Sequence, residues 1–153
     1  MTLIKIIYAS TSGNTELVCE FIADILQKEN FSVQLFRSEL CDVQVFDDSK
    51  FFILATSTWE HGEVNPYFTN LLNSMMQYDF SNKFAGFIGL GDVRYEPVFF
   101  TRGIDEIEKV FTANSGTKLC ETLRINGEPH DQLEELVIPW VKIFKNQILQ
   151  NEK

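Results

Sequence analysis

The stretch Leu3-Ile4-Lys5-Ile6-Ile7-Tyr8-Ala9 is an apolar run broken only by Lys5. Such a run is typical of a strand covered on both faces, which is the environment of strands in a parallel sheet. A polar cluster at 10–14 ends this strand, and apolar residues then recur at helical spacing from Leu17 to Leu26. The chain therefore opens with a buried strand, a polar turn and an amphipathic helix.

The same alternation continues to the end of the chain. Further strands are predicted at 32–36, 51–56, 84–90 and, more weakly, 117–123. Helices are predicted around 68–76, 104–111 and 133–148, and we expect a kink in the last one because Pro139 lies inside its apolar stripe.

Five strands alternating with helices and joined by right-handed crossovers predict an α/β fold. We expect one domain, residues 1–153, built on a doubly wound, five-stranded parallel sheet with helices on both faces. Ligands of such sheets gather at the carboxyl edge, so the loops after the strands are the candidate sites.

Charge and composition narrow the class of function. The chain has 13 Lys and Arg against 22 Asp and Glu, a formal charge of -9, which disfavours nucleic acid and anionic membranes and favours basic partners. The alternative is that this acidity only keeps the protein soluble. No leader or membrane-length apolar segment is evident, so we expect a soluble cytoplasmic protein. Three cysteines without C-x-x-C spacing argue against a disulfide framework or a zinc site.

The first polar turn has the composition of an anion cradle. It supplies hydroxyl groups, an amide and a permissive glycine at a helix N-terminus, where backbone N–H groups face an anion. It contains no Lys or Arg, which distinguishes it from a G-x-x-x-x-G-K-[ST] loop and favours a monophosphate. Simple helix capping is the alternative use of these residues. The residues are Ser10, Thr11, Ser12, Gly13, Asn14 and Thr15.

Two more loops complete a recognisable set. Thr56-Ser57-Thr58-Trp59-Glu60-His61-Gly62-Glu63 follows the third predicted strand, and Gly89-Leu90-Gly91-Asp92-Val93-Arg94-Tyr95-Glu96 contains the end of the fourth. With the first turn, they make the chain resemble the flavodoxin family over its full length, in the short form without an extra loop in the fifth strand. That resemblance implies the flavodoxin-like strand order 2-1-3-4-5 and a non-covalently bound FMN. The residues that would contact it, besides those of the first turn, are Ser57, Thr58, Trp59, Glu60, His61, Gly62, Leu90, Gly91, Asp92 and Tyr95.

The resemblance also implies how the flavin ring would be held. Trp59 and Tyr95 would lie against its two faces, and stacked aromatic rings suit a flat heterocycle. Gly91 would let the chain approach the ring closely, and the backbone of Leu90 would meet its pyrimidine end. Asp92 would lie near the ring and ribityl chain, or would form a turn by bonding its own backbone.

The second loop departs from the family pattern. The family often has Gly or Asn after the tryptophan, where a peptide turns its carbonyl toward the reduced flavin; here the residues are Glu60 and His61. A non-glycine residue at positive φ costs about 1–2 kcal/mol, so we expect a less stable one-electron-reduced flavin. His61 could make the redox potential pH-dependent near its ordinary pKa of about 6.5, or be simply solvated.

The predicted function is that of a low-potential electron carrier, not an enzyme and without a metal. Uncompensated carboxylates at Glu60, Glu63, Asp92 and Glu96 would make the reduced flavin a strong reductant and would meet basic partners. We expect a monomer whose partners are a ferredoxin/flavodoxin-NADP reductase and an acceptor enzyme. The alternatives are a flavodoxin-fold flavoenzyme, such as a quinone reductase, an activator of manganese ribonucleotide reductase, or an interaction module that binds no flavin.

Overall fold

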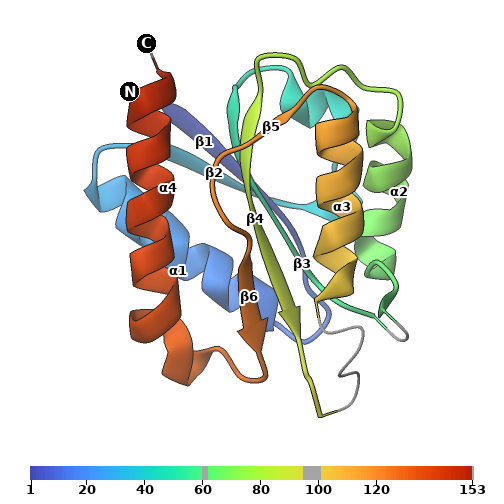
Figure 1. Cartoon of the computed structure of the whole chain (residues 1–153), viewed down its shortest axis with the longest axis vertical. Helices are drawn as coiled ribbons and strands as arrows, with labels where there is room; N and C mark the ends of the chain where they lie inside the picture. Colours follow the sequence, from blue (N-terminus) through green and yellow to red (C-terminus); the bar gives the residue numbers. More distant parts are fainter. Residues whose placement is uncertain (60–61, 95–100, 153) are drawn as a thin grey trace.

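The predicted strands form one parallel sheet in the order β2-β1-β3-β4-β5, with β6 also paired to β4 (Figure 1). The computed structural model describes residues 1–59, 62–94 and 101–152. The expected order 2-1-3-4-5 is confirmed. The strands are β1 (Leu3–Ala9), β2 (Ser32–Arg37), β3 (Phe51–Ser57), β4 (Phe84–Gly91), β5 (Thr117–Lys118) and β6 (Leu123–Asn126).

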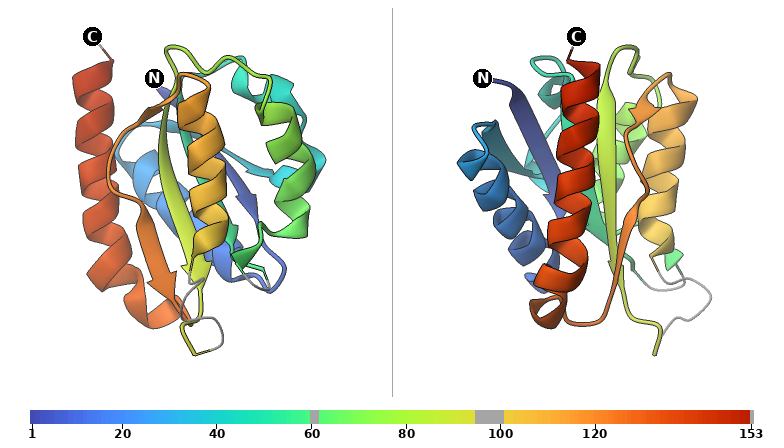
Figure 2. Two further views of the ribbon diagram at one scale, coloured as in Figure 1. Left: turned by 45° about the vertical axis from the view of Figure 1, so that its right-hand side comes forward. Right: turned by 60° about the vertical axis from the view of Figure 1, so that its left-hand side comes forward.

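Helices cover both faces of the sheet. Figure 2 shows α1 and α4 on one face and α2 and α3 on the other. The helices are α1 (Asn14–Lys28), α2 (Pro66–Met75), α3 (Arg102–Ala113) and α4 (Ile138–Asn151). Shorter turns are η1 (Ser38–Leu40), η2 (Val43–Phe46), η4 (His130–Gln132) and the π-helical η5 (Leu133–Val137).

Successive residues of the central strands contribute to two separate cores. In β1, Ile6 packs into the cluster under α1 and α4, whereas Ile7 packs into the cluster under α2 and α3. In β3, Ile53 and Leu54 divide in the same way. All four side chains are fully buried, because a strand covered on both faces points alternate residues into opposite layers.

The core under α2 and α3 is built largely of phenylalanine. Phe46 of η2 packs edge-on against Phe52 and Phe80, with ring centroids 5.2 and 4.9 Å apart. Phe111 of α3 continues the cluster at 4.6 Å from Phe80 and 5.6 Å from Phe87. Edge-to-face and tilted pairs at these separations add to the burial of the rings themselves.

The fifth strand is divided, which the sequence prediction of one strand at 117–123 did not anticipate. β5 pairs with the start of β4 and β6 with its end, and the residues between them leave the ladder. There the indole N–H of Trp140 donates to the carbonyl of Glu121 at 2.8 Å. The Trp140 ring lies over Gly86 of β4, so the chain bulges around a side chain that needs both space and an acceptor.

Pro139 also differs from its predicted place. It lies in the first turn of α4, a position at which proline is tolerated. The expected kink in one continuous helix is instead a π-helical turn, η5, followed by a helix that begins at Ile138.

Replacement of Gly86 by Ala tests the packing of α4 on β4. A Cβ at Gly86 would lie 2.8 Å from Trp140 and 2.9 Å from Phe144, so we expect a loss of about 1–3 kcal/mol in the free energy of unfolding. Gly103→Ala is the matched control, because a Cβ there meets only atoms at 3.4 Å. Urea denaturation of both variants measures the difference; equal losses would contradict the packing account.

Candidate functional site

A cleft of about 210 Å³ lies at the carboxyl edge of the sheet, where the predicted loops meet. Residues from the loops after β1, β3 and β4 line it together with the turn after β6. Seven of the predicted contact residues are thus brought together, and the last turn is an addition that sequence reasoning missed. The described predicted residues that do not line the cleft are Ser10, Thr11, Gly13, Thr15, Trp59 and Gly62. The lining residues are Ser12, Asn14, Ser57, Thr58, Leu90, Gly91, Asp92, Arg94, Gly127 and Glu128.

The turn after β1 is shaped by Gly13. Its φ of 91° is left-handed, which favours glycine, and its N–H donates to the Oγ of Ser10 at 3.1 Å. The first bond of α1 runs from the Leu17 N–H to the Gly13 carbonyl at 3.0 Å. The amides at the start of α1 therefore have no partner within the helix, which is the arrangement that attracts anions.

The side chains of this turn divide by exposure. Ser10 and Thr15 are buried, whereas Thr11 and Ser12 are exposed. Ser12 lines the cleft, and so does Asn14, the first residue of α1. The turn therefore presents a hydroxyl and an amide to the cleft, while Ser10 serves the internal geometry of the turn.

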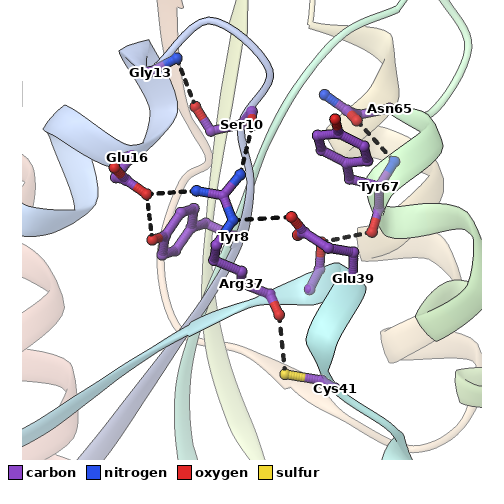
Figure 3. Close-up of polar contacts among 10 residues, drawn as sticks. Tyr8, Ser10, Gly13, Glu16, Arg37, Glu39, Cys41, Asn65 and Tyr67 are labelled. Atoms are coloured by element: carbon purple, nitrogen blue, oxygen red, sulfur yellow. Dashed lines mark hydrogen bonds and ion pairs between the residues drawn. The ribbon is translucent and has the colours of Figure 1, made fainter.

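An arginine from β2 lies behind this turn (Figure 3). Arg37 donates to the carbonyl of Ser10 at 2.9 Å, to Glu16 of α1 at 2.6 Å and to Glu39 of η1 at 2.9 Å. The hydroxyl of Tyr8 donates to the same Glu16 oxygen at 2.7 Å. Burial and the Glu16 contact raise the pKa of Tyr8 to about 12, so this hydroxyl stays a donor at neutral pH.

The loop after β3 is anchored on two sides. The N–H of Thr58 donates to the Leu90 carbonyl at 2.9 Å, which joins the second loop to the third. The N–H of Trp59 donates to the Glu63 carbonyl at 2.8 Å. Trp59 itself is 40% exposed, a high value for so large an apolar ring. Gly62 has a φ of 78°, as a tight return of the chain requires.

Asn65 connects this loop to α2. It is fully buried, its amide donates to the Ser57 Oγ at 2.7 Å, and its Oδ1 accepts the Tyr67 N–H at 2.9 Å as the cap of the helix. Because Ser57 Oγ accepts this bond, its own proton is directed elsewhere. Ser57 lines the cleft, so its hydroxyl can serve as a donor there.

The loop after β4 forms the Asp92 turn that the sequence left open as an alternative. The Oδ1 of Asp92 accepts the Arg94 N–H at 2.9 Å, and the Arg94 guanidinium contacts both carboxylate oxygens, the nearest at 2.7 Å. These bonds hold the pKa of Asp92 below its usual range. The expectation that Asp92 carries uncompensated charge was therefore wrong, because Arg94 pairs with it.

The turn after β6 closes the last side of the cleft. The N–H of Gly127 donates to the Gly91 carbonyl at 2.8 Å, and Asn126 Oδ1 accepts the Val93 N–H at 3.0 Å. The amide of Gln132 bonds the carbonyls of Asn126 and Glu128. The available sequence signal was the Asn-Gly pair at 126–127, a typical turn dipeptide that lies shortly after the predicted strand at 117–123.

Three predicted contact residues, Glu60, His61 and Tyr95, lie outside the described residues, as does the acidic Glu96. The aromatic pair around a flavin ring therefore stays a prediction. Within 1–59, 62–94 and 101–152, no cluster of His, Cys, Asp or Glu could hold a metal ion, and no helix is long and apolar enough to cross a membrane. The three cysteines in this part of the chain are free thiols.

Comparison with known proteins shows which family the chain resembles in sequence and in structure. The flavodoxin family model matches residues 6–140. The chain is 32% identical to "Probable flavodoxin 2" of Bacillus subtilis over 94% of its own length and 95% of that protein, and 34% identical to "Protein MioC homolog" of Haemophilus influenzae over 92% and 95%. Oxidised flavodoxin 2 of Bacillus cereus superimposes with a TM-score of 0.89 at 26% identity, covering 95% of this chain and 99% of that one.

The pairing of Asp92 can be tested by titration. In the wild type we expect the carboxyl of Asp92 to lose its proton below its ordinary pKa of about 3.9, and in Arg94→Gln we expect this pKa to rise toward the ordinary value. The backbone N–H at residue 94 remains, so part of the lowering should persist. Carboxyl ¹³C chemical shifts measured against pH give both values. An unchanged titration in Arg94→Gln would contradict the pairing.

Proposed function

The chain belongs to the flavodoxin family, and we propose on that basis that it binds one FMN non-covalently and carries electrons between partner proteins. The observation that carries the proposal is the cleft at the carboxyl edge, where the loops after β1, β3 and β4 meet. Its volume of about 210 Å³ is smaller than sites that enclose a ligand, about 300–1,000 Å³. It would hold part of a mononucleotide and leave the rest near the surface.

The first turn fits a phosphate monoester. It offers the exposed Ser12 hydroxyl, the Asn14 amide and the unpaired amides of a helix N-terminus. At Gly13 nothing lies within 4 Å of the place that a Cβ would take, so a group can approach the backbone there. The donors are neutral and oriented, which suits a dianion that the helix dipole also favours.

The other loops fit the rest of the cofactor. Trp59, next in sequence to the cleft residue Thr58, offers an exposed indole, and Gly91 offers backbone without a side chain. The Leu90 carbonyl already accepts one bond from Thr58 and retains a second lone pair for a ring N–H. FMN, once bound, supplies reversible uptake and release of electrons, and the protein supplies orientation and electrostatic environment.

The acidic surface supports docking to basic redox partners. The chain carries a net charge of -9, and Glu63 and Glu128 are exposed around the cleft. We propose a ferredoxin/flavodoxin-NADP reductase as the donor and a second redox enzyme as the acceptor. Association of this kind depends on complementary charge and weakens as salt screens it.

A single charge change at the cleft tests the proposal that the cofactor is FMN. We expect the purified protein to bind FMN one to one, and Ser12→Asp to weaken FMN affinity by about tenfold or more, because a carboxylate would face the phosphate. Riboflavin, which lacks the phosphate, should bind both proteins alike. Fluorescence quenching of the flavin measures both affinities.

Ser74→Asp is the matched control, because Ser74 is an exposed residue of α2 that does not line the cleft. It should leave both affinities unchanged. A wild-type protein that does not bind added FMN, or a Ser12→Asp variant with wild-type FMN affinity, would contradict the proposal.

The carrier role predicts a dependence on a reductase. NADPH alone should reduce the bound flavin slowly, and addition of a ferredoxin/flavodoxin-NADP reductase should accelerate reduction strongly at low salt. The acceleration should fall as ionic strength rises from about 0.01 to 0.5 M, because the Debye length shortens from about 30 Å to a few ångströms. Stopped-flow absorbance measures the rates. Fast reduction by NADPH without a partner would favour a flavoenzyme instead.

A further inference from the structure

The turn proposed to hold the phosphate contains no cation, yet a cation lies directly behind it. Arg37 of β2 donates to the carbonyl of Ser10, the first residue of that turn, at 2.9 Å. This contact joins residues 27 apart in sequence, and no motif of the turn itself specifies it. Figure 3 shows the guanidinium between the turn, the start of α1 and η1.

The second partner of Arg37 is a carboxylate that works against anion binding. Glu16 lies in the first turn of α1, and its Oε2 is 2.6 Å from Arg37 Nη1. Without a partner, a negative charge there would cancel part of the helix dipole that attracts the phosphate. The Arg37 side chain is 34% exposed and that of Glu16 equally so, so the pair is partly shielded from solvent.

The third partner fixes the orientation of the guanidinium. Glu39 of η1 accepts from Arg37 Nε at 2.9 Å, and the cation also lies 5.6 Å from the centroid of the Tyr8 ring. The planar guanidinium can donate in three directions at once, whereas a lysine ammonium is a point charge on a flexible stem. The network therefore depends on arginine in particular.

We infer that Arg37 is a positioning residue for phosphate recognition: it holds the Ser10–Gly13 turn in place and neutralises Glu16 at the start of α1. The inference rests on the proposed binding of FMN. Arg37 acts through Ser10 and Glu16, so its effect should depend on the ligand's phosphate and on the charge at Glu16.

The first test compares two flavins. Arg37→Gln should lower FMN affinity by about tenfold, because the charged hydrogen bond to Ser10 is lost and Glu16 keeps only the neutral Tyr8 hydroxyl as a partner. Riboflavin affinity should change by less than about threefold. Arg37→Lys should fall between the wild type and Arg37→Gln, since it keeps the charge but not the three-way contact. Fluorescence quenching gives the affinities, and thermal unfolding of the apo proteins shows whether each variant folds.

Lys28→Gln is the matched control. It removes the same charge from the other end of α1, where Lys28 pairs with Asp24 at the surface. FMN affinity should stay within about twofold of the wild type. A loss equal to that of Arg37→Gln would mean that net charge alone matters and would overturn the inference.

A double variant separates neutralisation from a merely structural role. Glu16→Gln alone should raise FMN affinity by about twofold to fivefold, because a charge that opposes the phosphate is removed. Glu16→Gln combined with Arg37→Gln should recover part of the affinity lost in Arg37→Gln. If Arg37 neutralises Glu16, Glu16→Gln should raise FMN affinity more in the Arg37→Gln background than in the wild type, whereas if Arg37 only supports the local fold, the factor should be the same in both backgrounds.

The outcomes distinguish this inference from the proposed function. A wild-type protein that does not bind FMN defeats the proposed function. A wild-type protein that binds FMN, with Arg37→Gln showing an equal loss for FMN and riboflavin or no loss, defeats the role of Arg37 alone. An effect of Glu16→Gln that is equal in the wild-type and Arg37→Gln backgrounds also overturns it.

Discussion

Burial of the sheet on both faces is the constraint on which the rest of the structure depends. The central strands β1, β3 and β4 have no exposed residues, and their connections cross the faces of the sheet through α1, α2 and α3, while β2 returns to β3 through the short turns η1 and η2. Helical crossovers keep the strands parallel and bring their carboxyl ends to one edge (Figure 1). Three polar loops that are far apart in sequence meet there because the apolar residues before them are buried in this way.

The periodicity of apolar residues predicted this framework, because each strand or helix is specified by residues that are close together in sequence. The apolar runs at 3–9, 51–56 and 84–90 matched β1, β3 and β4 to within a residue. Phe46 was missed, since a short 3-10 turn has no repeat from which a buried face could be recognised. The division of the fifth strand was also missed, because it depends on the Trp140 ring, which the fold brings over Gly86.

The sequence motifs identified most of the residues that line the cleft, but not the residues that hold those lining residues in place. The candidate residues Ser12, Asn14, Thr58, Gly91 and Asp92 all line the cleft. Their supports come from other strands and are set by tertiary packing, which a single sequence does not display. The contributions of β2, at Arg37, and of the turn after β6 are of this kind. A short motif specifies the groups that face a ligand, whereas the residues that orient those groups come from distant parts of the chain.

The cations near the cleft are paired with the chain's own acids. Arg37 pairs with Glu16 and Glu39, and Arg94 pairs with Asp92. Each ion pair sets the shape of a loop while cancelling local charge. The net charge of -9 therefore remains on acids that these cations do not balance, including the exposed Glu128 in the lining of the cleft. The proposed binding of a phosphate through oriented dipoles and the proposed docking of a basic partner on the acidic surface are therefore compatible.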